Sequence, residues 1–106
     1  MTDIKIIQGN KLFDLVFTLQ DDTGTVQDVA GASIKFKAQK VGTKELKVNG
    51  DMAIVDAAAG QCKYQVQAAD FDDPGKYYGE IEVTFSDGQI TSFPTPTIIV
   101  EAKLPK

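Results

Sequence analysis

The sequence contains no histidine, no arginine and no tryptophan, and it contains a single cysteine. Without histidine, the chain lacks the commonest general base near neutral pH. Without arginine, and with a net charge of -4, it lacks both the attractive field and the bidentate guanidinium group with which proteins read nucleic acids. These absences predict a non-enzymatic protein that binds no cofactor and no nucleic acid.

The single cysteine, Cys62, cannot form a disulfide within the chain, so packing must hold the fold together. No apolar run approaches the roughly 20 residues that cross a bilayer. The first ten residues, MTDIKIIQGN, carry neither a basic leader nor an apolar run of signal-peptide length. We therefore expect a chain that is made and folded in a cytoplasm and has no membrane partner.

The length and composition are those of a globular domain. The chain has 106 residues, of which 42% are hydrophobic and 25% charged. A domain of this length buries roughly 65% of the surface that its unfolded chain exposes. We expect one domain over residues 1–106 with an ordinary hydrophobic core.

Alternation of apolar and polar residues dominates the chain and predicts strands whose one face is buried. The clearest strands are predicted over 12–19, 33–39, 61–67 and 77–85, and shorter ones over 4–8, 45–48, 52–56, 89–93 and 97–102. No segment of comparable length has a helical period. Pro94 and Pro96 cannot donate to a ladder, so the last strand should begin after a kink or lie at an edge.

Turn residues separate these strands. Asn49-Gly50 and Asp87-Gly88 are strong hairpin signals, because glycine supplies the positive φ that tight turns require. Seven to nine short strands with polar turns at this spacing predict an immunoglobulin-like antiparallel β-sandwich without a disulfide.

The segment DPGKYYGEIEVTFSDG begins with an Asp-x-Gly-x-Tyr spacing formed by Asp73, Gly75 and Tyr77. This spacing resembles the tyrosine corner of immunoglobulin-like domains, in which the tyrosine hydroxyl bonds upstream backbone. An ordinary core tyrosine after a turn is the alternative. Antibody domains would have cysteine at Gly79 and a core tryptophan, and this chain has neither.

Few residues could support chemistry. Cys62 falls on an inward strand face and is expected to be a buried structural thiol. The acidic run 70–73 could in principle bind calcium, but residue 81, twelfth from Asp70, is isoleucine where an EF-hand needs glutamate. A solvated corner is the alternative. Glu80 and Glu82 share an outward face, as a catalytic pair of carboxylates might. Because nothing nearby supplies a cleft, a solvated sheet surface is the interpretation we favour.

The candidates for an interface are an exposed aromatic residue and a group of lysines. Tyr78 points away from Tyr77 and could anchor a partner. Five lysines lie between residues 35 and 47, including Lys35 and Lys37 on one predicted strand. They could bind an acidic partner, or they could protect an exposed sheet edge against aberrant pairing, which is the interpretation we favour.

Several segments in this order resemble one known group, the immunoglobulin-like domains of tailed-phage structural proteins, particularly the N-terminal domain of baseplate upper proteins. The segments are Ile7–Asn10, Leu19–Gly24, Val29–Phe36, Gly60–Tyr64, Asp73–Tyr77, Glu82–Gly88 and Phe93–Pro94. Each is mostly turn chemistry, so their order and spacing carry the resemblance. Further segments follow this domain in baseplate proteins, so the sequence corresponds either to a piece of such a protein or to a small relative.

The resemblance implies a non-enzymatic building block of a virion, assembled in the host cytoplasm. Such a protein would dock to copies of itself or to other phage structural proteins of the baseplate, tail or neck. The resemblance transfers no functional residue, because the matched positions determine the fold. A module that binds carbohydrate or another ligand is the alternative function, although a chain without tryptophan offers few aromatic platforms.

Overall fold

The computed structural model describes residues 3–21, 23–67 and 69–104. The residues described form nine strands: β1 (Ile4–Ile7), β2 (Asp14–Thr18), β3 (Ser33–Lys40), β4 (Leu46–Asp51), β5 (Ala53–Asp56), β6 (Gln61–Gln65), β7 (Gly75–Thr84), β8 (Ile90–Pro94) and β9 (Ile98–Glu101). Each lies within two or three residues of a strand that the alternation predicts.

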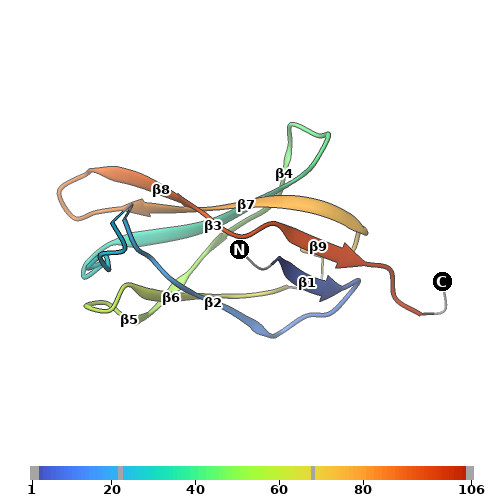
Figure 1. The fold of residues 1–106 in the computed structure, drawn as a ribbon, viewed down its shortest axis with the longest axis horizontal. Helices are drawn as coiled ribbons and strands as arrows, with labels where there is room; N and C mark the ends of the chain where they lie inside the picture. The colour runs from blue at the N-terminus through green and yellow to red at the C-terminus, as the bar shows by residue number, and fades with distance from the viewer. Residues whose placement is uncertain (1–2, 22, 68, 105–106) are drawn as a thin grey trace.

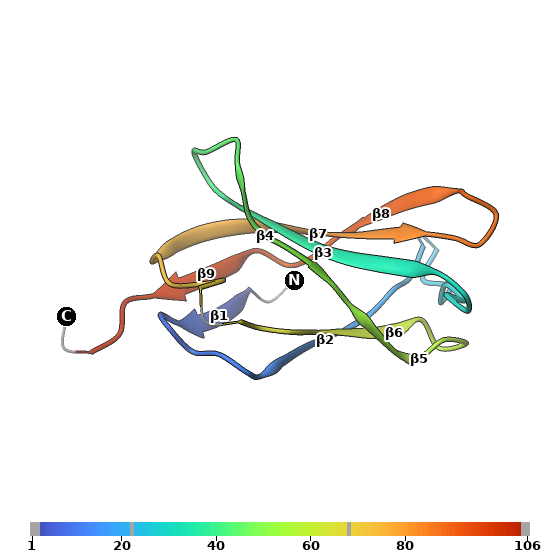
Figure 2. The same ribbon diagram turned by 180° about the vertical axis from the view of Figure 1, so that it is seen from behind.

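The strands form two facing layers (Figures 1 and 2). The larger sheet has the order β1-β9-β7-β3-β4, with β8 beside β7, and the smaller sheet has the order β2-β6-β5. All pairs are antiparallel except β1 with β9, which is parallel. The protein is therefore an immunoglobulin-like β-sandwich, as the sequence predicts.

Strand β7 is the central strand of the larger sheet. One of its edges pairs with β3 over eight register positions. Its other edge pairs first with β9, from Gly75 to Tyr77, and then with β8, from Glu80 to Thr84. The segment 95–97 separates β8 from β9, and there the Thr95 amide donates to the Gly79 carbonyl at 3.1 Å. Pro94 ends β8 and Pro96 lies in this interruption, so β9 begins after both prolines and lies between β1 and β7, not at an edge.

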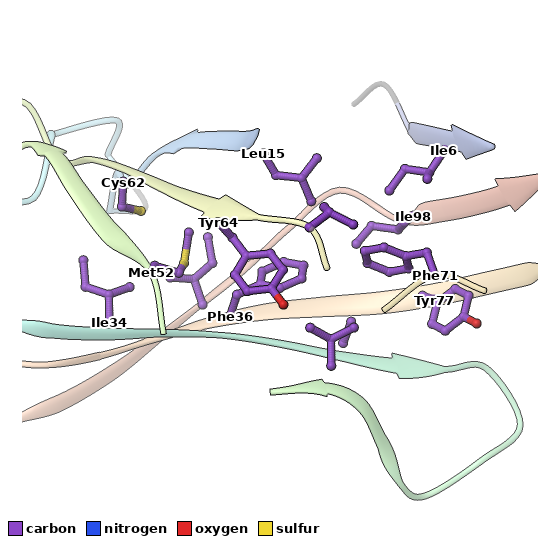
Figure 3. Packing of buried hydrophobic residues seen from close by; sticks show 14 of the residues in the cluster. Ile6, Leu15, Ile34, Phe36, Met52, Cys62, Tyr64, Phe71, Tyr77 and Ile98 are labelled. Carbon is purple, nitrogen blue, oxygen red and sulfur yellow. The ribbon is translucent and has the colours of Figure 1, made fainter. Parts of the chain in front are cut away.

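The core lies between the layers and follows the alternation (Figure 3). Phe36 stacks on Tyr64 with ring centroids 4.9 Å apart, and Cys62 is a buried free thiol. Large apolar side chains each contribute about 1.5–3 kcal/mol on full burial, so the core alone can offset much of the entropy of folding. The fully buried large side chains are Tyr77, Phe36, Phe71, Ile81, Ile98, Val29, Val66, Val83 and Cys62.

One of the two predicted hairpins is correct and the other is wrong. Phe85 and Gln89 close the β7–β8 hairpin around Asp87 and Gly88, with the Phe85 amide donating to the Gln89 carbonyl at 2.8 Å. The segment Asn49-Gly50, by contrast, lies inside β4, and the chain continues from β4 into β5 of the other sheet.

Gly50 is required for packing and not for a turn. A Cβ at this position would lie 2.7 Å from Cε1 of the Tyr64 ring. The ring of Tyr64 covers the space that a side chain at residue 50 would fill, and this close approach brings the two sheets together where the chain crosses between them. Glycine is favoured both in tight turns and where another group approaches the backbone closely, so the sequence alone does not distinguish the two uses at Gly50.

Candidate interaction surface

The three residues of the predicted corner lie together at one end of the sandwich. Tyr77 is 0% exposed, and its hydroxyl donates to the backbone carbonyl of Asp73 at 2.6 Å, the type of contact that a tyrosine corner makes. Its ring meets Phe71 edge-on, at 5.5 Å between centroids. Gly75 has a φ of +145°, a conformation that side-chain-bearing residues rarely adopt. Burial, followed by the nearby carboxylates, raises the pKa of Tyr77.

The acidic run beside the corner is engaged in contacts within the protein. The Asp70 carboxylate accepts from the Gln67 amide at 2.8 Å and from the Tyr64 hydroxyl. Asp72 pairs with Lys47 at 2.7 Å, and Asp73 pairs with Lys40 at 2.8 Å.

These contacts also shift two pKa values. Hydrogen bonding to Lys47 holds the pKa of Asp72 below its usual value. Burial, together with the Asp70 contact, raises the pKa of Tyr64. Within the described ranges, no three acidic, cysteine or histidine side chains gather as metal ligands would.

The lysines of β3 do not protect a sheet edge. Lys35 and Lys37 lie on a strand that pairs with β7 on one side and with β4 on the other, so the edge interpretation is wrong for both. The cause is topological, because β4 covers one edge of β3 and the other edge is covered by β7, which comes from a part of the chain more distant in sequence. Lys37 instead forms an ion pair with Glu82 on β7, with 3.0 Å between Nζ and Oε2.

Cys62 is not an activated nucleophile. Its side chain is 0% exposed, and burial raises the pKa of its thiol to about 11. The thiol is therefore protonated at neutral pH, whereas a nucleophilic cysteine needs a lowered pKa.

Among the residues that the structure describes, none forms a helix that could span a bilayer.

The outer face of the larger sheet carries a line of apolar side chains that we call the diagonal band. It consists of Ile7 on β1, Ile99 on β9, Tyr78 on β7 and Leu46 on β4. Ile99 pairs with Lys5 and with Lys76, so Ile7 and Tyr78 are its diagonal neighbours, each about 7 Å away. Gln39 pairs with both Tyr78 and Leu46, which places those two side chains in one row.

The diagonal band is open to solvent. Tyr78 is 61% exposed, Leu46 47% and Ile7 40%. Tyr78 and Leu46 also line a hollow with Lys37, Gln39, Gly79 and Glu80. The β3–β4 hairpin rises above the larger sheet, away from the smaller one, and forms a wall at one side of this face (Figure 1). The face thus carries a hollow beside an exposed aromatic ring, with charged side chains around it.

The sequence pointed to Tyr78 but not to the rest of the diagonal band. Tyr78 was found because alternation places it opposite Tyr77. Ile99 and Ile7 are outward positions of their strands, and the register shift between Ala38 and Gln39 turns Leu46 to the same face. Only the register shows that the three lie in one line with Tyr78. An apolar residue at a position that alternation assigns to solvent is the signal that could have found Ile7 and Ile99. Leu46 carries no such signal, because alternation places it on the inward face with Val48.

A second hollow, which we call the polar hollow because most of its lining residues have polar side chains, lies between the β2–β3 connection and β8. Asp21 stands at its rim and accepts hydrogen bonds from the amides of Thr23 and Thr25, both at 2.9 Å. A further bond from the Thr23 hydroxyl is the main reason that the pKa of Asp21 is lowered. The hollow is lined by Gln20, Asp21, Thr23, Gln27, Thr91, Ser92, Phe93 and Pro94.

Comparison with known proteins finds solved structures that are similar to this chain. The solved structure of murine CRIg is similar to this chain with a TM-score of 0.43 and 10% sequence identity, over 95% of this chain and 92% of that one. No protein-family model matches the sequence, and no curated protein matches it.

Proposed function

We propose that this protein is a non-enzymatic docking module of a tailed-phage particle, built into the baseplate, tail or neck. It acts by protein–protein contact within a multi-copy assembly in the virion, after synthesis in the host cytoplasm. The phage assignment rests on the order of sequence segments described above. The docking assignment rests on the diagonal band.

The single observation that carries docking is the exposure of Tyr78 at the centre of an apolar line. Tyrosine is enriched at the centres of interfaces, where its ring buries a large area at little entropic cost. Ile99 lies diagonally beside Tyr78 on one side, Leu46 lies in the same row beyond Gln39 on the other, and lysine and glutamate side chains surround the ring. An apolar centre with a polar rim is the usual anatomy of a protein interface.

Copies held in one particle would make even weak contacts sufficient. Once one contact forms, the neighbouring sites act at the high effective concentration that the assembly imposes. A rigid sandwich suits this role, because little ordering entropy is lost on binding. The buried hydroxyl contact of Tyr77 keeps the end of β7 fixed beside Tyr78.

The test is capture of the proteins encoded by neighbouring genes. Flanking tail and portal genes are expected, and their purified products should bind this protein in pull-down and light-scattering experiments. Tyr78→Ala should weaken binding at least tenfold. Val16→Ala is the matched control, because Val16 is 58% exposed on the outer face of the smaller sheet. Equal loss in both variants, or no binding to any tail protein, would contradict the proposal.

A carbohydrate-binding module is the second candidate, and the polar hollow favours it. Amide and hydroxyl side chains such as those of Gln27 and Ser92 are suited to sugar hydroxyls, with Phe93 beside them. Binding on a glycan array that is lost in Gln27→Ala but kept in Tyr78→Ala would support this function. Binding lost in Tyr78→Ala would place the sugar on the diagonal band instead.

A further inference from the structure

The outward side of β7 carries an arrangement of charge that is its own complement. Lys76, Tyr78 and Glu80 point outward in succession, so a cation and an anion lie on opposite sides of the aromatic ring. At about 3.4 Å per residue, each charge is about 7 Å along the strand from Tyr78. Within the described residues, neither Lys76 nor Glu80 forms an ion pair, whereas the neighbouring Lys37 and Glu82 pair with each other.

We propose that the outer face of the larger sheet binds a second copy of this chain. The two copies are related by a two-fold axis that lies between the faces and crosses β7 at Tyr78. Each β7 then runs antiparallel to the other, the two Tyr78 rings meet, and each Lys76 lies opposite the Glu80 of the other copy. This proposal rests on the proposed docking function and names the partner of the diagonal band.

Charge selects this axis over the other possible one. A two-fold axis parallel to β7 would set Lys76 against Lys76 and Glu80 against Glu80, and like charges across an interface are costly. The axis perpendicular to the strands converts both contacts into attractive pairs. Because the interface is isologous, the favourable pair occurs twice.

The raised β3–β4 hairpin is compatible with the same axis. The hairpin follows Lys40, and the Val41 amide donates to the Lys76 carbonyl at 2.9 Å, so the hairpin lies at the Lys76 end of the face. The proposed axis exchanges the two ends, which sets the two hairpins at opposite ends and prevents a collision. Each hairpin then faces the Glu80 end of the other copy.

The size of the face is sufficient for a stable contact. The molecule extends 47 × 26 × 24 Å, and the larger sheet contains six of the strands. A standard interface buries about 800 Å² on each partner, which a face of this size can supply. A second copy also explains why a cation and an anion lie at equal distances from one central ring, because an unrelated partner would not need that arrangement.

The test is a charge exchange measured by analytical ultracentrifugation over a range of concentrations. The wild-type protein should form dimers. Lys76→Glu and Glu80→Lys should each weaken the dimer about tenfold or more, because every attractive pair becomes a repulsive one. Mixing these two variants should restore association as a heterodimer, and the variant with both changes should dimerise with itself but not with the wild type.

Controls and contrary outcomes separate this inference from the proposed function. Val16→Ala should leave the dimer unchanged, and circular dichroism should show that every variant is folded. A wild-type protein that stays monomeric, or single variants that dimerise normally, would overturn self-association. If that monomer still captures a tail protein through Tyr78, the docking function stands. A dimer with the expected charge pattern that binds no tail protein would support the inference and count against the phage role.

Discussion

Tyr77 and Tyr78 are neighbours of the same residue type, and the fold uses them in opposite ways. Tyr77 is 0% exposed and bonds the Asp73 carbonyl, whereas Tyr78 is 61% exposed and stands at the centre of the diagonal band. Successive residues of a strand point to opposite faces, so one position along the chain separates the two roles. Burial, and not residue type, therefore decides whether an aromatic ring supports stability or recognition.

The same division extends along the whole of β7. Its inward positions after Tyr77 are Gly79, Ile81 and Val83, and the two larger residues are buried. A Cβ on Gly79 would overlap the hydroxyl oxygen of Thr95, so the half-buried Thr95 side chain occupies the space beside Gly79, where an antibody domain has a cysteine. The outward positions carry charges and the exposed ring. One face of β7 is thus packed to completion and the other is left available.

The largest expected difference is between alanine substitutions of the two tyrosines. Tyr77→Ala should lower the free energy of unfolding by about 3–5 kcal/mol, because it removes a buried ring and leaves a cavity. Tyr78→Ala should change it by less than about 0.5 kcal/mol. Urea unfolding followed by circular dichroism measures both. Similar losses in the two variants would remove the basis of the comparison.

Gly79→Ala is expected to have the next largest effect. The added methyl group collides with the Thr95 side chain, and overpacking of this kind costs about 1–3 kcal/mol. Thr95→Ala in the same protein should recover part of the loss, because it removes the overlapping hydroxyl. A double variant that is as unstable as the sum of the two single variants would show that the contact is not responsible.

Tyr77→Phe isolates the hydroxyl contact from the ring. The variant should lose about 1 kcal/mol of unfolding free energy, because the Asp73 carbonyl loses its donor while the packing of the ring is kept. Tyr78→Phe is the matched control and should be close to neutral. The measurement is again urea unfolding, with equal slopes required for the comparison. A neutral Tyr77→Phe would indicate a ring that fills space without a useful hydrogen bond.

Alkaline pH should lower the free energy of unfolding through the buried titratable side chains. Burial raises the pKa of Cys62 to about 11 and raises the pKa values of Tyr64 and Tyr77. A group whose pKa is raised by folding stabilises the folded state fully below its unfolded pKa and loses that contribution as the pH rises through the folded value. Stability should therefore fall from about pH 9 upward. Unfolding free energies between pH 8 and 11 should show a shallower fall in Tyr77→Phe and in Cys62→Ala, and a flat profile in the wild type would contradict this.

Alternation predicted the strands well because it is a local property with a period of two. The strand over Ser33–Lys40 buries Ile34, Phe36 and Ala38 as expected, and the strand over Gln61–Gln65 buries Cys62 and Tyr64. The turn at Asp87 and Gly88 was also predicted from local chemistry. These features need no knowledge of which strands pair.

The failures all depend on pairing between distant segments. The dipeptide Asn49-Gly50 predicts a hairpin from local chemistry. In the structure, the Tyr64 ring occupies the space above Gly50, and β4 continues past this residue. Lys35 and Lys37 were predicted to lie on an edge strand, but β4 and β7 pair with the two edges of that strand. Leu46 and Ile99 became neighbours of Tyr78 only through the register.

The sequence by itself determined which residues of each strand face inward, where most turns fall, and that Tyr77 and Tyr78 lie on opposite faces, because these follow from the geometry of an extended chain. Only the tertiary structure decided which strands are central, which glycine serves packing, and which exposed side chains form one surface. Those outcomes depend on long-range register, and a shift of a strand by one position would reverse every face it presents.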